Sequence, residues 1–299
     1  MLSGAMAGCT AVTFSNPFDH AKVRLQLQGE LKARGNYQVF YKNSLDCIIK
    51  VARYEGIFKV QRGLSAAYCY HILCNGTRLG SYESVKTFFN RHTSLKENSS
   101  LLNLVTAMTG GFIGSAISIP FTLVKVRLQS DHPYQETRHN YKGLRDAFRH
   151  IWRSEGAKGF VHGINIWPFA LAWTSGVQLT SYDFAKNIFM KNLGMADSLS
   201  TQILSAIISA IAIPIFCNPT DCLATRMLNQ KWDHGHGEKY RGLLDCLIKT
   251  ARIEGVRGLY KGFTGFTARQ LPHCIVSMIS FEFYKKETRA LFGLKEIRH

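Results

Sequence analysis

The sequence predicts an all-α membrane protein whose six transmembrane helices form three pseudo-symmetric repeats, each with a short surface helix. Three observations predict this fold. The stretch from Pro17 to Gln26 returns in related form at Pro120 and at Pro219, about 100 residues apart. Each copy follows a long uncharged apolar run. Glu-Gly pairs share the same period, beginning at residues 55, 155 and 254. Independent markers with one period indicate structural repeats, here about residues 1–92, 93–192 and 193–299 of a single domain.

Composition restricts the class of partner. The 299 residues carry a net charge of +17, yet the mean hydropathy is only −0.06, so basic and apolar residues are segregated along the chain. A basic surplus fits nucleic acid, an anionic membrane surface or an anionic substrate. The chain has no zinc-finger cysteine spacing and no RNA-binding aromatic pattern, so we expect no nucleic-acid partner. The eight cysteines lie mostly in apolar runs, which indicates packing residues rather than a disulfide framework.

The first repeat opens with an uncharged run from Met1 to Phe18, in which small residues such as Gly4 and Gly8 permit close helix packing. A proline just after such a run kinks a continuing helix more often than it begins one, so we expect this helix to reach about Gln28. An amphipathic segment over residues 43–54 predicts the surface helix. The second span begins at Gly63, and polar side chains interrupt it, as expected if one face lines water.

The second and third repeats follow the same order. Uncharged spans cover residues 101–124 and 199–219, an amphipathic segment lies near residues 143–152, and a fourth span covers residues 164–182. The even-numbered spans close with aromatic–acid pairs that begin at residues 82, 182 and 281. The loops after the odd-numbered spans are long and basic, whereas those after the even-numbered spans are nearly neutral. The positive-inside rule therefore places the long loops on one side of the membrane and both termini on the other.

The three copies of the proline motif on six predicted spans resemble the mitochondrial carrier family over essentially the whole chain. The resemblance implies a six-helix bundle around a water-filled cavity, with one substrate site and ion-pair networks that alternately close its two ends. It also implies a monomer in the mitochondrial inner membrane, with the surface helices on the matrix side and the termini toward the intermembrane space. Several stretches, including residues 61–68, 75–80 and 177–179, are similar to the oxaloacetate/sulfate carrier branch.

The resemblance implies two gates. In the family, each motif acid pairs with the lysine of another repeat, and glutamines brace these pairs. The implied matrix gate consists of Asp19 with Lys125, Asp221 with Lys22, and the bracing Gln26 and Gln129. The third pair would join Thr122 and Ala224, so both of its charges are missing together. Their joint loss is physically consistent, because either charge alone would be unpaired in a low-dielectric site. Leu228 stands where a third bracing glutamine would be.

The opposite, cytoplasmic gate is complete in the sequence. Its implied members are Glu83 with Lys186, Asp183 with Lys285, and Glu282 with Lys86, braced by Tyr82 and Tyr182. Taken singly, each acid–lysine spacing also fits an exposed helix pair worth a few tenths of a kcal/mol. The threefold recurrence of the spacing favours the gate interpretation.

Ionisable residues inside membrane spans are candidates for function. Arg78 and Arg269 match the family's substrate-contact positions on the second and sixth spans, with Asn75 one turn before Arg78. A guanidinium suits a carboxylate or a sulfate, although an arginine satisfied by backbone carbonyls is an alternative. Gln178 and His71 are further candidates to line the cavity, with His71 expected to be neutral.

The fourth span departs from the carboxylate carriers, which place an arginine where this chain has Ala170 and Leu171. A small residue followed by an aliphatic one is closer to nucleotide carriers, and Trp167 or Trp173 could stack on a base. Both tryptophans are more often packing or lipid-facing residues. The alternatives to anion exchange are therefore nucleotide or coenzyme exchange, or a non-exchanging proton-leak or scaffold role on the carrier fold.

Bound cardiolipin is the only accessory group that the resemblance implies, and we expect no cofactor and no metal. Helix starts rich in glycine would hold its phosphates through backbone N–H groups. The glycines concerned are Gly63, Gly143, Gly163, Gly242 and Gly262. His234 and His236 lie in a loop without a further ligand, so we expect a solvated loop there. No acid–base or nucleophile constellation is visible, so the sequence predicts a transporter and not an enzyme. Its expected substrates are oxaloacetate-like dicarboxylates and sulfate, exchanged by antiport.

Overall fold

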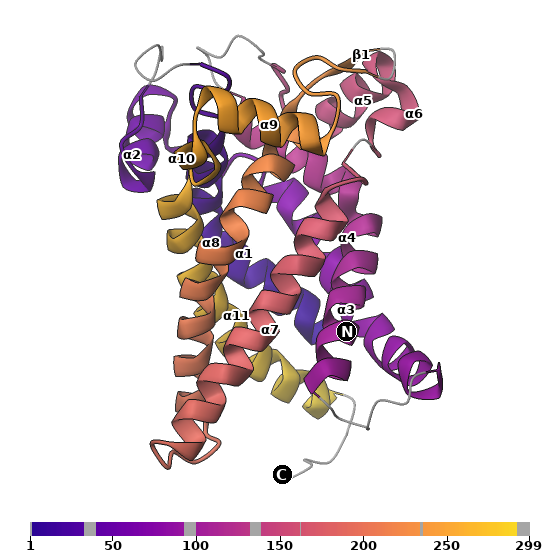
Figure 1. Ribbon diagram of the computed structural model, residues 1–299, viewed down its shortest axis with the longest axis vertical. Helices are drawn as coiled ribbons and strands as arrows, with labels where there is room; N and C mark the ends of the chain where they lie inside the picture. The colour runs from indigo at the N-terminus through magenta and orange to yellow at the C-terminus, as the bar shows by residue number, and fades with distance from the viewer. Residues whose placement is uncertain are drawn as a thin grey trace.

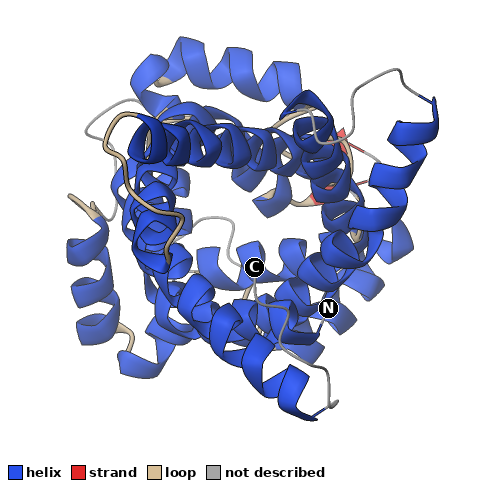
Figure 2. Cartoon of the chain, turned by 90° about the horizontal axis from the view of Figure 1, so that it is seen from below, coloured by secondary structure: helices blue, strands red, loops and turns tan. Residues whose placement is uncertain are grey.

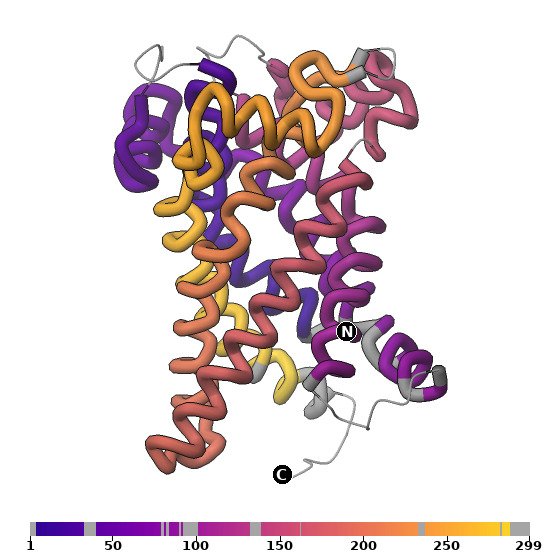
Figure 3. The backbone as a smooth tube through the Cα atoms, in the orientation of Figure 1, coloured from indigo at the N-terminus to yellow at the C-terminus, as the bar shows by residue number. Residues whose placement is uncertain are grey.

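The computed structural model describes residues 2–32, 40–92, 100–131, 139–161, 163–233 and 236–291. Six long helices form a bundle, and Figure 2 shows them end-on as a ring. Successive long helices pack against one another, and the last packs against the first, so the chain goes once around the ring (Figure 3). These helices are α1 (Leu2–Leu27), α3 (Leu64–His92), α4 (Ser100–Ser130), α7 (Trp167–Lys191), α8 (Leu199–Asn229) and α11 (Phe263–Leu291).

Three short helices lie at one end of the bundle, at the top of Figure 1, which we call the surface-helix end. They are α2 (Ser44–Tyr54), α5 (Leu144–Ser154) and α9 (Leu243–Ile253). A single turn follows each of them: η1 (Ile57–Gln61), α6 (Gly156–Gly159) and α10 (Val256–Leu259). The helices begin alike, because Asp46, Asp146 and Asp245 each accept a hydrogen bond from the backbone N–H four residues earlier. This capping in the first turn fixes where the chain turns into each surface helix.

The fold class predicted from the sequence is confirmed, and the motif prolines lie where it expected them. Pro17, Pro120 and Pro219 are inside α1, α4 and α8, and these helices continue past them. The predicted end of the first helix, near Gln28, is within one residue of its observed end. The uncharged spans of the second and third repeats stop at residues 124 and 219, whereas α4 and α8 continue to Ser130 and Asn229.

Small residues set the distances between neighbouring long helices. A side-chain carbon placed on Gly114 of α4 would lie 2.8 Å from the carbonyl oxygen of Cys74 in α3. One placed on Gly111 would lie 2.6 Å from Oγ of Ser175 in α7. Gly76 has nothing within 4 Å of the same position, so it is not at a helix contact here. The glycines of α4 therefore allow it to approach both of its neighbours closely.

Within the described residues, two segments are long and apolar enough to cross a membrane by length and composition alone, Leu101–Ser130 and Leu199–Asn229. They belong to α4 and α8. The loop after α8 contains a pair of antiparallel two-residue strands, β1 (Trp232–Asp233) and β2 (His236–Gly237). His236 therefore lies in a short hairpin, whereas His234 is outside the described residues.

Candidate functional site

A polar cavity of about 510 Å³ lies at the centre of the ring, and all six long helices contribute to its wall. Its volume is in the range of sites for small ligands. Every residue that the sequence predicted to bind substrate lines it: Arg78, Arg269, Asn75, Ala170, Leu171 and Gln178. The structure therefore brings together residues from α3, α7 and α11 that are up to 194 positions apart in the chain.

Two buried ion pairs lie at the surface-helix end of the cavity. Nζ of Lys125 is 2.6 Å from Oδ2 of Asp19, which joins α4 to α1. Nζ of Lys22 is 2.7 Å from Oδ2 of Asp221, which joins α1 to α8. All four side chains line the cavity and are largely shielded from solvent. They are the two pairs that the sequence implied for the first gate.

Glutamines brace both ion pairs. Nε2 of Gln26 donates a hydrogen bond of 2.7 Å to Oδ2 of Asp221. Nε2 of Gln129 donates one of 3.2 Å to Oδ2 of Asp19. Each carboxylate thus receives a hydrogen bond as well as an ammonium group, which is what a buried ion pair needs to compensate for lost hydration.

The third position of this layer has two buried, uncharged side chains, Thr122 and Ala224. Thr122 is 1% exposed and donates its hydroxyl hydrogen to the carbonyl oxygen of Ser118, within its own helix. Ala224 is fully buried in an apolar cluster of α7, α8 and α9 residues. The contact between the second and third repeats therefore has neither of the gate charges at this level.

Arg269 is closer to the gate than the sequence indicated. Its Nε lies 2.9 Å from Oδ1 of Asp19, whereas Lys125 has its shortest contact with Oδ2. Its Nη1 donates a hydrogen bond of 3.3 Å to Oε1 of Gln270. Asp19 consequently has a cation from α4 on one oxygen and a cation from α11 on the other.

Arg78 has a different environment. Its side chain passes over the glycines of α4, with Cγ 3.7 Å from where a side-chain carbon on Gly110 would be. Among the described residues, no carboxylate forms an ion pair with its guanidinium, which lines the cavity. Arg78 is thus a cation available to an incoming anion.

Histidine and aromatic side chains complete the wall. The rings of His71 and His273 have centroids 5.3 Å apart, and Nδ1 of His273 is 3.2 Å from Oγ of Ser15. Trp167 lines the cavity, and its ring and that of Tyr70 are in a T-shaped arrangement with centroids 6.5 Å apart. Trp173 is 47% exposed and does not line the cavity, as expected for a packing or lipid-facing residue.

At the other end of the bundle, the structure describes only some of the side chains expected to form the second gate. Tyr182 lines the cavity, and Nζ of Lys186 is 2.8 Å from Oδ2 of Asp197, a loop residue that the sequence did not pair with it. The side chains of Tyr82, Glu83 and Glu282 are outside the described part of the chain. The expected pairs of Glu83 with Lys186 and of Glu282 with Lys86 therefore stay predictions. Asp183 and Lys285 are both described, and they form no ion pair with each other in this structure.

Sequence reasoning missed a ring of three arginines at the surface-helix end. Each arginine makes a two-pronged ion pair with the Glu of its own repeat's Glu-Gly pair. Each also donates to a carbonyl oxygen at the end of a long helix of another repeat, at 3.3 Å in all three cases. The signal was present, since both partners recur with the repeat period. The sets are Arg24, Glu55 and Gln129; Arg127, Glu155 and Leu228; and Arg226, Glu254 and Gln26.

The glycines expected to bind cardiolipin occupy two kinds of position. Gly143 and Gly242 are the N-caps of α5 and α9, and as glycines they have no side chain that could accept a hydrogen bond from the first backbone N–H groups of these helices. Gly63 and Gly262 precede α3 and α11 with φ of +82° and +79°, which only glycine adopts without strain. Gly163 precedes α7 and is buried against Leu228. Among the described residues no group of three or more His, Cys, Asp and Glu side chains could hold a metal ion.

A ring of six long helices around a polar cavity, with ion pairs across one end, defines a solute transporter of the membrane. The sequence model described as "Mitochondrial carrier protein" matches residues 1–93, 96–193 and 196–290, so the chain belongs to the mitochondrial carrier family. Members of this family are transporters of the mitochondrial inner membrane, and the chain is accordingly a transporter and not an enzyme.

Three relatives show how far the similarity extends. The chain is 38% identical to the mitochondrial oxaloacetate transport protein of Saccharomyces cerevisiae, over 97% of this chain and 91% of that protein. It is 37% identical to mitochondrial citrate transporter E of Aspergillus niger, over 97% and 93% respectively. It is 32% identical to human solute carrier family 25 member 35, over 97% of both chains.

Proposed function

We propose that this carrier exchanges small dianions, oxaloacetate-like dicarboxylates and sulfate, by alternating access. The charge of the cavity carries the proposal. Its described lining has four cations and two carboxylates, a net surplus of two positive charges, because Lys125 and Arg269 share the carboxylate of Asp19. Excess charge in a site shielded from water is costly, and a bound dianion neutralises it. The six residues are Lys22, Arg78, Lys125 and Arg269 against Asp19 and Asp221.

The substrate would bind mainly between the two arginines. Planar guanidinium groups form paired hydrogen bonds with carboxylate or sulfate oxygens, and Asn75 and Gln178 add polar groups to the same wall. The names of the first two relatives, an oxaloacetate transport protein and a citrate transporter, support a carboxylate substrate.

Binding at Arg269 would also act on the gate. A substrate anion that takes this guanidinium competes with Oδ1 of Asp19, which weakens the set of contacts that closes the surface-helix end. A ligand shifts a conformational equilibrium only by binding the two states differently, and this competition provides such a difference. On this proposal the surface-helix end is the matrix gate and both termini face the intermembrane space. The carrier would act as a monomer, with cardiolipin at the glycine-bearing helix starts.

Nucleotide exchange is the second candidate, and one observation favours it. Trp167 lines the cavity beside Ala170 and Leu171, so an aromatic face is available where a base could stack. The ring of Trp173 is excluded from such a role by its position outside the cavity.

The test is exchange in liposomes that contain the purified protein. Uptake of labelled sulfate, oxaloacetate and ATP is compared, with each of the three, or none, loaded inside. Sulfate and oxaloacetate should enter rapidly only when one of them is inside. Exchange of ATP alone would contradict the proposal and support the hypothesis of nucleotide exchange. Uptake that ignores the internal solute, or no uptake of any of the three, would contradict exchange of these anions.

A further inference from the structure

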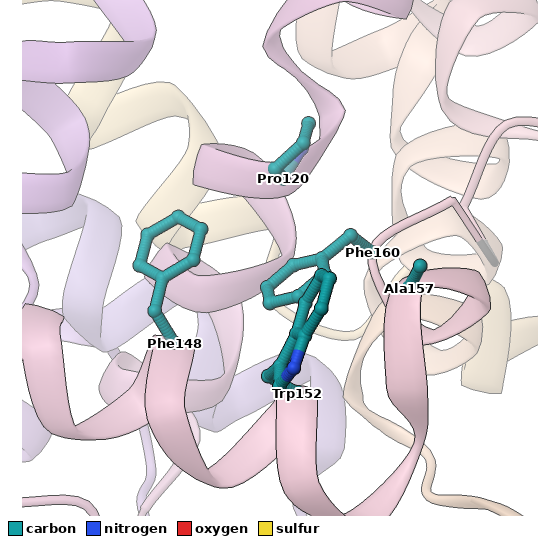
Figure 4. Close-up of a pocket in the computed structure, with 5 residues that line it drawn as sticks. All are labelled: Pro120, Phe148, Trp152, Ala157 and Phe160. Carbon is teal, nitrogen blue, oxygen red and sulfur yellow. The ribbon is translucent and has the colours of Figure 1, made fainter.

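A second pocket lies on the second repeat, outside the ring of cavity residues. It measures about 510 Å³, and its lining has almost no polar atoms: Pro120, Phe148, Trp152, Ala157 and Phe160. Figure 4 shows the rings of Phe148, Trp152 and Phe160 around one space, with the proline of α4 on its far side. Phe148 and Phe160 stack with ring centroids 5.1 Å apart, whereas Trp152 is 63% exposed. The pocket is therefore apolar, and it is open to the surroundings beside Trp152 of α5.

The aromatic lining is peculiar to this repeat. The Glu-Gly pairs align the three surface helices, and the corresponding positions in the first and third repeats are aliphatic or alanine. Phe148 corresponds to Ile48 and Leu247, Trp152 to Ala52 and Ala251, and Phe160 to Val60 and Leu259. The pocket is thus not a general consequence of the fold.

The outer face of the same helix also differs in charge. Arg145 and Arg149 are exposed, and no described carboxylate forms an ion pair with either of them. Aligned positions of the other repeats have exposed aliphatic side chains: Leu45, Ile49, Leu244 and Ile248. Because residues three apart are neighbours on a helix, Arg149 and Trp152 share one edge of α5, and so do Arg145 and Phe148. By helical spacing, each arginine is therefore one turn from an aromatic residue that lines the pocket.

We propose that the pocket binds one acyl chain of an anionic phospholipid whose phosphate contacts Arg145 and Arg149. An amphipathic helix at the membrane surface places its apolar side among acyl chains and its basic side among headgroups. Each arginine near an anionic surface adds attraction for the headgroup, and an exposed tryptophan prefers the same boundary. Arg145 is in the first turn of α5, next to the glycine site expected for cardiolipin at Gly143, whereas Arg149 and the aromatic pocket are farther along the helix. The proposed site requires only that the chain lies in a membrane and does not depend on the transported substrate.

Fluorescence of the full-length protein in liposomes tests the proposal. Phospholipids with brominated acyl chains quench a tryptophan that they contact, and the difference between wild type and Trp152→Phe isolates residue 152. Brominated phosphatidylglycerol at low mole fraction should quench Trp152 at least twofold more than brominated phosphatidylcholine at the same fraction. Equal quenching by the two lipids, or none by either, would overturn the site; the latter would mean that the pocket faces water or protein.

Variants separate the two parts of the site. Arg145→Leu with Arg149→Ile copies the first repeat and should abolish the preference for the anionic lipid. Arg53→Leu with Lys59→Leu removes the same charge from exposed positions of the first repeat and should leave the preference intact. Ala157→Phe fills the pocket and should reduce quenching by both lipids. A preference that survives the arginine variant, or that the control variant also removes, would refute a specific headgroup contact.

Discussion

Arg269 lies 2.9 Å from Asp19, so the principal substrate-binding candidate of α11 also holds one oxygen of a gate carboxylate. The shortest contact of Lys125 is with the other oxygen of this carboxylate, Oδ2. Since the Thr122–Ala224 position has no charges, this arginine is the third cation among the described residues that contact the two gate carboxylates. The site and the closure are therefore linked through one carboxylate.

The two arginines of the cavity should respond differently to removal of their charge. Arg269→Gln takes a charge partner from buried Asp19, so we expect a loss of about 1–3 kcal/mol in stability together with roughly tenfold or greater loss of anion uptake. Arg78→Gln should impair uptake comparably but change stability by less than about 0.5 kcal/mol, because no described carboxylate depends on it. Thermal unfolding in detergent and uptake into liposomes measure both effects. Equal destabilisation by the two variants would contradict the shared-carboxylate interpretation.

The uncharged gate position should accept an engineered pair but not half of one. Thr122→Asp alone buries a carboxylate without a partner and should cost about 3–5 kcal/mol and most of the transport. Adding Ala224→Lys should restore part of both. The comparison of single and double variants by thermal unfolding and uptake is decisive, and a double variant no better than Thr122→Asp would show that these positions do not meet.

Two glycines offer a matched test of helix packing. Gly114→Ala forces a carbon against the backbone oxygen of Cys74, so a loss of about 1–3 kcal/mol is expected. Gly76→Ala enters open space in a helix interior and should stabilise by about 0.5–1 kcal/mol. Thermal unfolding of both variants checks this, and a destabilising Gly76→Ala would mean that α3 closes against a neighbour in another populated state.

The charge surplus of the cavity predicts how selectivity can be changed. Leu171→Arg would raise the surplus from two to three, so uptake of citrate relative to oxaloacetate should rise about tenfold, an effect of roughly 1–2 kcal/mol. Leu171→Gln provides a polar side chain without charge and should leave the ratio near that of wild type. Competition between the two labelled substrates measures the ratio. A similar change in both variants would point to shape rather than charge.

His139, in the loop before α5 and outside the membrane spans, predicts a pH effect. Burial first, and nearby Arg127 second, lower its pKa to about 4, while its ring hydrogen-bonds the carbonyl oxygen of Asn229. In the unfolded chain this histidine has a pKa near 6.5 and binds a proton more readily. The stability of the folded protein therefore falls as pH is lowered from about 6.5 toward 4. At pH 5 the loss is about 2 kcal/mol.

The matched variant for this effect is His139→Gln, which keeps a side-chain donor but does not titrate. Between pH 7 and pH 5 the wild type should lose about 2 kcal/mol more stability than this variant, as thermal unfolding at the two pH values would show. Identical pH profiles of the two proteins would show that His139 is not the residue responsible.

The fold was predictable because its signals are periodic. Pro17, Pro120 and Pro219 mark the three repeats, and residues 43–54 have an amphipathic pattern that only a surface helix explains. The limits of an uncharged run do not give the end of a helix: charge reappears at Lys125, yet α4 extends to Ser130.

The site was predictable in its members but not in its contacts. Family positions placed Arg78 and Arg269 in one cavity, yet the approach of Arg269 to Asp19 depends on how α11 packs on α1, which no local pattern records. The Arg226–Glu254 pair was missed for another reason. Both residues recur with the repeat, but a Glu-Gly pair at the end of a short helix was interpreted as a marker and not as a ligand for an arginine.

The arginine ring has a consequence for the order in which the chain completes its structure. Arg226 of α8 donates to the carbonyl oxygen of Gln26, 200 residues earlier, in the last turn of α1. Arg24 in turn donates to Gln129, and Arg127 to Leu228. Each repeat therefore depends on another repeat for a hydrogen-bond partner at the end of its first long helix. The carbonyl oxygen of Gln26, in the first helix to be synthesised, receives its partner only when α8 has been made. Contacts between such distant residues form slowly. We expect the first two repeats to stay incompletely hydrogen-bonded until the third repeat has been synthesised and has packed against them.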